Sequence, residues 1–196
     1  MTTFANEAEF EAAVIRELRR RGWGDAEVIK YPSEADLWAN WNRILFENNR
    51  GKDRLNEVPL TNSEMQQIRE QITALRTPLK LNGFINGKTV AITRDNPADA
   101  LHFGKEVSLK IYDRHEIAAG QSRYQIVLQP RYARGSPLLN DRRADVLLLI
   151  NGIPVIHIEL KKSGVAVSQA YNQIQKYSRE GIFTGLFSLI QIFVAM

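Results

Sequence analysis

Apolar residues recur every three or four positions through the first 75 residues of the chain, and this spacing predicts helices. Asn6 can cap a first helix together with Glu9, and that helix ends near Gly22. A second helix is expected within residues 33–52, where Asn and Gly residues stop it. A third is expected over residues 61–75, opened by a Thr-Asn-Ser cap and closed before a proline.

The residue composition changes after position 81, where β-branched and aromatic residues become frequent. We expect a hairpin over residues 83–95 and strands over 106–113 and 123–129. A second hairpin is expected in the two apolar runs of "ADVLLLINGIPVIHIEL", followed by a helix over residues 168–179. The uncharged ending "LFSLIQIFVAM" predicts a strand buried on both faces, with further chain expected beyond it in a longer protein.

Composition narrows the class of protein. A chain of 196 residues with 44% hydrophobic content can bury one core, so a single domain over residues 1–196 is expected. The absence of cysteine excludes a disulfide framework and a Cys-ligated zinc site, and it fits a reducing cytoplasm. The N-terminus lacks the apolar block of a signal peptide and no apolar run reaches membrane-spanning length, so we expect a cytoplasmic protein with no membrane partner.

The net charge of the chain is only +4, which is weak evidence for a polyanionic partner. The local distribution of charge is more informative. Between positions 121 and 145, five arginines face a single intervening acid, Asp141. These arginines are Arg123, Arg131, Arg134, Arg142 and Arg143. Such a cluster suits the phosphates of a nucleic acid, and a solvated basic face explains it equally well.

Three charges interrupt the second hairpin, namely Asp145, Glu159 and Lys161. Because side chains alternate along a strand, His157, Glu159 and Lys161 project from the same face. A surface ion pair worth about 0.2 to 1 kcal/mol is the simplest interpretation. The flanking residues are apolar on both faces, however, and charges in a covered strand are costly unless they are paired or bind an ion.

The turn decides whether Asp145 can reach Glu159, because cross-strand partners keep a fixed sum of residue numbers. A two-residue turn at Asn151-Gly152 makes that sum odd and sends Asp145 to the opposite face. A three-residue loop beginning at Ile150 sets Asp145 across from His157 and diagonal to Glu159. We therefore predict this odd loop or a β-bulge.

An Asp followed by Glu-Leu-Lys on the next strand resembles the motif of the PD-(D/E)xK nuclease superfamily, here with Ala144 in place of the usual proline. Gln173 and Tyr177 lie one helical turn apart and match the Q-x-x-x-Y motif typical of the RecB-like branch. The whole chain resembles the N-terminal nuclease domain of the restriction subunit of type I restriction-modification enzymes. That likeness lies in "FEAAVIRELRRRGW", "EVPLTNSEM", "ADVLLLINGIPVIHIELKKSG" and "AYNQIQKY".

The resemblance implies an α/β fold with a restriction-endonuclease-like core, in which helices flank a mixed central sheet and a helical segment precedes it. It also implies a Mg2+-dependent DNA endonuclease acting on double-stranded DNA, in a complex with methyltransferase and specificity subunits. In that family two RecA-like motor domains follow the nuclease domain and use ATP. This sequence contains no G-x-x-x-x-G-K-[ST] phosphate loop, so ATP would bind only outside it.

The resemblance also assigns roles to residues. Metal ligands would be Asp145, Glu159 and the main-chain carbonyl of Leu160, which suit Mg2+ or Mn2+ as its substitute. Lys161 would position the attacking water or offset charge in the transition state, while Gln173 and Tyr177 would contact a water on the metal or a DNA phosphate. Glu11 would lend a further acid from the first helix, although an acid there also simply complements the helix dipole. The local charge cluster, and the position of Lys162 just past the motif, independently lead us to expect DNA contacts at Arg134, Arg142, Arg143 and Lys162.

Two residue classes are expected to be structural instead. His157 is more easily explained as a packed strand histidine than as a substrate contact, and the three tryptophans as core residues. Two other functions stay open. One is a nuclease domain of a different helicase-nuclease, or one that resolves DNA junctions. The other is a non-catalytic DNA-binding or assembly module that anchors the motor subunit to its methyltransferase partner. The intact Asp145, Glu159 and Lys161 argue against such a decayed module.

Overall fold

The computed structural model describes residues 4–24, 28–86, 89–112, 122–132 and 142–196. These residues group into two compact units. The first unit comprises the chain up to Leu37 and from Arg123 to Met196, and the second runs from Trp38 to Ser122. All the described candidate site residues belong to the first unit, which is therefore described first.

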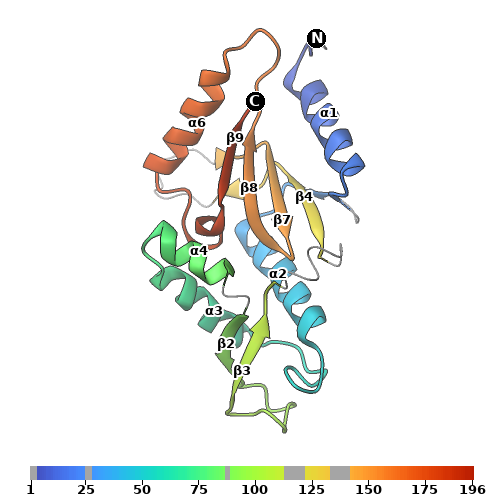
Figure 1. The fold of residues 1–196 in the computed structure, drawn as a ribbon, viewed down its shortest axis with the longest axis vertical. Coiled ribbons are helices and arrows are strands. Elements are labelled where there is room, and N and C mark those ends of the chain that lie inside the picture. Colours follow the sequence, from blue (N-terminus) through green and yellow to red (C-terminus); the bar gives the residue numbers. More distant parts are fainter. Residues whose placement is uncertain (1–3, 25–27, 87–88, 113–121, 133–141) are drawn as a thin grey trace. The chain divides into compact units, whose positions relative to one another are not determined.

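A five-stranded mixed sheet forms the centre of the first unit, in the order β1-β4-β7-β8-β9 (Figure 1). The strands are β1 (Ile29–Lys30), β4 (Tyr124–Leu128), β7 (Val146–Ile150), β8 (Ile153–Glu159) and β9 (Ile192–Ala195). The two outer pairings, β1 with β4 and β8 with β9, are parallel, and the two inner pairings are antiparallel. Two short strands, β5 (Arg131–Tyr132) and β6 (Arg142–Arg143), pair separately.

Helices α1 (Glu7–Arg20) and α6 (Val167–Arg179) flank this sheet (Figure 1). Asn6 caps α1 by accepting a hydrogen bond from the Glu9 amide, as the sequence predicts. The apolar stripe of α1 packs on the face that carries Ile126, Leu148 and Ile158. The opposite face carries His157, whose ring meets that of Tyr177 on α6 at 6.2 Å between centroids. The predicted α/β architecture, with a mixed sheet flanked by helices, is confirmed and is consistent with a restriction-endonuclease-like fold.

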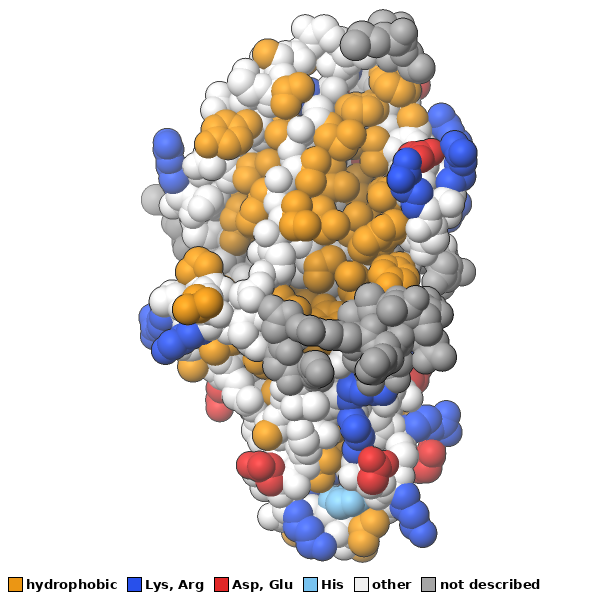
Figure 2. Space-filling view, in the orientation of Figure 1, with side chains coloured by type: hydrophobic (Ala, Val, Ile, Leu, Met, Phe, Trp, Pro, Cys, Tyr) orange, Lys and Arg blue, Asp and Glu red, His pale blue; other side chains and the backbone are white. Residues whose placement is uncertain are grey.

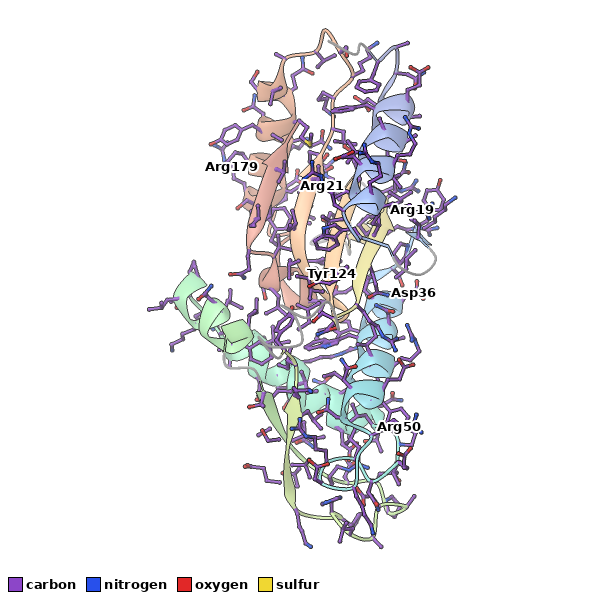
Figure 3. The ribbon with its side chains drawn as sticks, turned by 45° about the vertical axis from the view of Figure 1, so that its right-hand side comes forward. Arg19, Arg21, Asp36, Arg50, Tyr124 and Arg179 are labelled. Carbon is purple, nitrogen blue, oxygen red and sulfur yellow. The ribbon has the colours of Figure 1, made fainter. Side chains whose placement is uncertain are left out.

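The tryptophan of this unit has the structural role expected of it. Trp23 is partly buried against the core of the sheet. Its ring meets Tyr124, labelled in Figure 3, edge-on at 5.2 Å between centroids. The aromatic pair therefore joins the end of α1 to β4, since edge-to-face geometry is favourable at this separation.

The end of the chain differs from the prediction of a doubly buried strand. A 3-10 helix, η1 (Gly185–Leu189), takes up the first part of the run, and only β9 is a strand. Strand β9 is at the sheet edge, and Ile192 and Phe193 remain 52% and 42% exposed. Hydrophobic side chains gather over the sheet between α6 and α1, on the side seen in Figure 2. Continuous hydrophobicity alone did not distinguish the buried helical turn from the half-covered edge strand.

The second unit contains α3 (Asn62–Ala74), α4 (Pro78–Asn86) and the antiparallel pair β2 (Thr89–Thr93) and β3 (Glu106–Lys110). Helix α2 (Glu34–Asn49) contains the boundary between the units, after Leu37. Thr61 and Glu64 form the capping box that opens α3, and Trp38 and Trp41 are buried as expected.

The predicted hairpin over residues 83–95 is wrong, because its first part belongs to α4 and β2 pairs with β3 instead. Pro78 is the first residue of α4, where its fixed φ favours a helix.

A buried ionic cluster organises the second unit. The Arg94 guanidinium is fully buried and lies 2.7 Å from a Glu64 carboxylate oxygen and 3.0 Å from one of Asp99. It also donates to the carbonyl of Val58. The guanidinium therefore has partners on several sides, which buried charge requires. Across the described ranges of both units, no helix is long and apolar enough to span a membrane.

Candidate active site

The β7–β8 hairpin brings Asp145 to the end of the strand pair where Glu159 lies. Asn151 and Gly152 form a two-residue turn with φ values of 50° and 85°, which is the left-handed conformation that such turns require. A bulge then shifts the register, because Leu149 pairs with Pro154 while Leu148 pairs with Ile156. The predicted bulge is confirmed, and the alternative three-residue loop is wrong.

The bulge adds the extra residue Val155 to β8. Beyond it, the residue numbers of cross-strand partners add up to an even number, whereas next to the turn they add up to an odd number. Leu147 then pairs with His157 and Val146 with Ile158. Continuing this register sets Asp145 directly opposite Glu159, instead of diagonal to it as the loop would have done. Both carboxylates therefore project from the face of the sheet that α6 covers.

Asp145 and Glu159 form a carboxyl pair that is largely withdrawn from water. Glu159 is fully buried, and Asp145 is partly buried and accepts a 2.7 Å hydrogen bond from the Leu160 amide. Burial raises the pKa of Asp145 to about 6, and the neighbouring charge of Glu159 contributes to this rise. Burial also raises the pKa of Glu159 to about 7. The side chains are close enough to hydrogen-bond each other, so below neutral pH the pair shares a proton.

Helix α6 supports Glu159 through the residues of the predicted Q-x-x-x-Y motif. The Gln173 side-chain amide donates to Oε2 of Glu159 at 2.8 Å and contacts the Tyr177 hydroxyl at 2.7 Å. Tyr177 in turn donates to the main-chain carbonyl of Arg143. Burial, with the nearby charge of Glu159, raises the pKa of Tyr177 to about 12, so this hydroxyl keeps its proton. The structure thus brings Gln173 and Tyr177 to the carboxyl pair.

His157 is fully buried, as expected for a packed strand histidine. Burial lowers its pKa to about 4, so the ring is neutral near pH 7. Tyr132, which sequence reasoning missed, lies 2.8 Å from Nδ1 of His157 through its hydroxyl. If the tyrosine donates, the imidazole proton resides on Nε2, which lies 3.0 Å from Oε1 of Glu159.

The contact between Nε2 of His157 and Oε1 of Glu159 is close but poorly aligned. Among the described residues neither atom has a hydrogen-bond partner of good geometry, although both are buried. A buried carboxylate oxygen without a partner is costly and therefore rare. Nothing in the local sequence around Tyr132 indicated its part in this chain of contacts, because two short paired strands bring it there from outside the central sheet.

Lys161 and Glu11 lie at the edge of the carboxyl pair. The Lys161 ammonium is 3.7 Å from a Glu7 carboxylate oxygen, and its positive charge lowers the pKa of both Asp145 and Glu159. Burial raises the pKa of Glu11, a hydrogen bond from Gln129 opposes this, and the charge of Asp145 raises it again. Helix α1 therefore contributes an acid near the pair, and Gln129 is a second neighbour that sequence reasoning missed.

The predicted DNA-contacting residues differ in their surroundings. Arg142 is held by Glu180 through two hydrogen bonds of 2.8 Å, and this pairing raises the pKa of Arg142. Arg143 and Lys162 are exposed. Arg134 lies outside the described residues. The structure therefore leaves the role of these residues in DNA binding as a prediction.

The donor set fits a hard divalent cation better than zinc. No group of three or more His, Cys, Asp and Glu side chains within the described ranges is arranged around a common metal position. Mg2+ does not need such a group, because it is typically held by one or two carboxylates and keeps several waters. Asp145 and Glu159 supply two adjacent carboxylates, and the unpartnered Oε1 of Glu159 indicates that the pair is not fully satisfied by the described residues.

The first unit thus has the α/β architecture of the restriction-endonuclease-like class, with its acidic pair at one end of the central hairpin. A family model described as "Type I restriction enzyme R protein N terminus (HSDR_N)" matches residues 4–196. The chain belongs to this family, which confirms the resemblance noted in the sequence.

Curated relatives are named as endonuclease subunits of type I restriction enzymes. The chain is 30% identical over 194 residues to the type I restriction enzyme SsaAORF53P endonuclease subunit of Staphylococcus saprophyticus. It is 28% identical over 197 residues to the SauMSSORF170P endonuclease subunit of Staphylococcus aureus. These matches cover 97% of the chain but only 18% of each relative. The EcoprrI endonuclease subunit of Escherichia coli is 29% identical over 183 residues, which cover 84% of the chain and 56% of that relative.

Proposed function

We propose that this chain is the endonuclease domain of a type I restriction enzyme and hydrolyses phosphodiester bonds of double-stranded DNA. The observation that carries the proposal is the pair of Asp145 and Glu159, which the bulge sets opposite each other: one carboxyl group is partly buried and the other fully buried, both have raised pKa values, and Lys161 is nearby. Isolated acids in a covered strand are destabilising, and their placement is understandable if they bind a cation. The family membership and the endonuclease names of the relatives support the same reaction class.

Mg2+ is the cofactor that we propose, with Mn2+ as its substitute, held by Asp145, Glu159 and the Leu160 carbonyl. When bound, it would neutralise charge on the phosphate and make a nearby water more acidic. Lys161 would hold that water or donate to the phosphate as negative charge develops. Gln173 fixes the orientation of the Glu159 carboxylate through its 2.8 Å hydrogen bond, and Tyr177 fixes Gln173.

Further partners follow from the same family. Methyltransferase and specificity subunits would complete the enzyme, and ATP would act only through motor domains outside this sequence. In that arrangement sequence recognition belongs to another subunit, so this domain needs contacts to the DNA backbone and not to base edges. A non-catalytic assembly module is the competing function, and it requires neither metal binding nor the paired acids.

Calorimetric titration of Mg2+ and Mn2+, with and without a DNA duplex, tests the proposal on the wild type and Glu159→Gln. The glutamine variant keeps the size of the side chain and an acceptor for Gln173 but removes the charge. We expect metal binding to be lost in Glu159→Gln and kept in a control, Glu17→Gln, whose carboxylate on α1 pairs with Arg20 and with Arg21 just after the helix. Cleavage by the assembled enzyme should follow the same pattern. Equal metal binding and cleavage in all three proteins would refute the nuclease site.

A further inference from the structure

One side of α6 carries a row of exposed or half-exposed hydrogen-bond donors. Gln169, Asn172, Gln173 and Lys176 follow the spacing i, i+3, i+4 and i+7, which puts them on one face of the helix. The helix sequence VSQAYNQIQKYSR contains no acidic residue, and its charged residues are Lys176 and Arg179. Its other side is buried through Ala170, Ile174 and Tyr177. Gln169, Asn172 and Lys176 are therefore exposed, and Gln173 lies at the border between this row and the core.

This row forms one wall of a groove of about 390 Å³. Its lining residues are Arg142, Gln169, Asn172, Gln173, Lys176 and Tyr177. None of the described lining residues is acidic. Gln173 and Tyr177 use their donors within the protein, so the donors that face the groove come from Gln169, Asn172 and Lys176 and from the remaining N–H groups of Arg142. Arg142 is fixed in this wall by its two hydrogen bonds to Glu180. The groove thus offers amide and cationic donors, which is the chemistry that recognises phosphate oxygens.

Gln173 connects the groove to the carboxyl pair. Its side-chain amide lines the groove and donates to Oε2 of Glu159 at 2.8 Å. A DNA strand with one phosphate at Asp145 and Glu159 would therefore have its neighbouring phosphates beside α6. The row from Gln169 to Lys176 spans seven residues, or about 10 Å of helix. The row is therefore long enough to contact more than one phosphate of the strand, because its donors lie at successive heights along the helix.

We propose that this groove is a binding subsite for the backbone phosphates that flank the cleaved bond. The proposal rests on the proposed nuclease function and adds Gln169, Asn172 and Lys176 to the residues that contact DNA. Because the donors are spread along the helix and do not converge on one point, they suit a row of phosphates better than a single small anion. Amide and ammonium groups that contact phosphates carry no sequence information, so the subsite binds all sequences alike.

Fluorescence anisotropy of a labelled 20-base-pair duplex tests the subsite in metal-free buffer, where no cleavage occurs. The variants are Lys176→Ala, Asn172→Asp and their combination. Asn172→Asp is nearly isosteric and introduces a charge that repels phosphate, so it perturbs binding without removing volume. Arg19→Ala is the matched control, because it removes one exposed positive charge from α1, which packs on the other face of the sheet (Figure 3).

We expect the double variant to bind the duplex at least about 10-fold more weakly, with an equal loss for duplexes of unrelated sequence. The slope of log affinity against log salt should become shallower by about 0.9 in Lys176→Ala, as one phosphate contact is lost. Arg19→Ala should leave both quantities unchanged. Circular dichroism melting of each variant verifies that α6 remains folded.

The experiments distinguish failure of the subsite from failure of the proposed nuclease function. If the α6 variants bind DNA like the wild type while Glu159→Gln still abolishes metal binding and cleavage, the subsite is refuted and the nuclease function stands. If the wild type binds neither metal nor duplex, both are refuted. A loss of affinity that is equal in Arg19→Ala and Lys176→Ala would reflect net charge alone and would also overturn the subsite.

Discussion

Replacing Asp145 by asparagine should stabilise the metal-free protein and abolish its function. The asparagine side chain would keep an oxygen that accepts the Leu160 amide, which now donates to Asp145 at 2.7 Å. Its amide could also donate to Glu159, whereas the native pair places two carboxyl groups within hydrogen-bond reach. The substitution therefore removes a repulsive, desolvated charge and leaves the local hydrogen bonds in place.

The size of the effect follows from the pKa of Asp145, which burial raises from 3.8 to about 6. An acid whose pKa is raised on folding binds more protons in the native state, so it lowers stability as pH rises from its unfolded pKa through its folded pKa. Two pKa units correspond to about 3 kcal/mol above pH 7, and to roughly half of that at pH 5. Movement of the pair reduces this, so we expect a gain of about 1 to 3 kcal/mol at pH 8.

Urea denaturation of the wild type and Asp145→Asn at pH 8 and pH 5, each with and without Mg2+, measures these quantities. In the wild type Mg2+ should raise stability, by about 2.7 kcal/mol at a concentration 100 times its dissociation constant, and in the variant it should not. Cleavage by the assembled enzyme should disappear. A loss of about 3 to 5 kcal/mol in metal-free Asp145→Asn would instead mark Asp145 as a buried ion-pair partner and refute the reasoning.

Three further substitutions test other parts of the structure. Tyr132→Phe should cost about 1 to 3 kcal/mol in urea denaturation, because Nδ1 of buried His157 loses its partner at 2.8 Å, and unchanged stability would contradict this contact. Glu64→Gln should destabilise the second unit by about 3 to 5 kcal/mol, since Arg94 stays buried with less opposing charge, and unaltered hydrogen exchange in β2 and β3 would argue against it. Lys161→Ala should lower cleavage by about 10²- to 10³-fold with little change in stability, because its Glu7 partner at 3.7 Å is 52% exposed; undiminished cleavage would remove Lys161 from the mechanism.

Local signals in the sequence predicted local structure well. The Asn6 cap and the Thr61–Glu64 capping box lie at the first turns of α1 and α3, because these side chains satisfy amides that the helix leaves free. The strand β4 and the helix α6 also agree with the hydrophobic spacing within one or two residues. Each of these predictions depends only on neighbours within about one helical turn or one strand.

Predictions that required tertiary information were less successful. Phe84 and Ile85 have the composition of a strand but lie in α4, whose start at Pro78 outweighs their preference. The hydrophobic pattern of the C-terminal residues predicted neither η1 nor the edge strand β9. Hydrophobicity indicates that a residue is apolar, but it does not identify the element that covers the residue. Tyr132 and Gln129 reach the carboxyl pair only through the fold, so no spacing in the sequence could identify them.

The β7–β8 hairpin depends on both local sequence signals and tertiary structure. Asn151-Gly152 strongly favours a two-residue turn, and that turn alone would direct Asp145 away from Glu159. The extra residue Val155 reverses this outcome, at the cost of an irregular ladder in the centre of the sheet. A sheet optimised only for stability would need neither the bulge nor two desolvated acids at its end. Their combination in one hairpin is explained if the carboxyl pair binds the proposed cation, because removing the acids would relieve their desolvation and removing the bulge would put the two carboxylates on opposite faces.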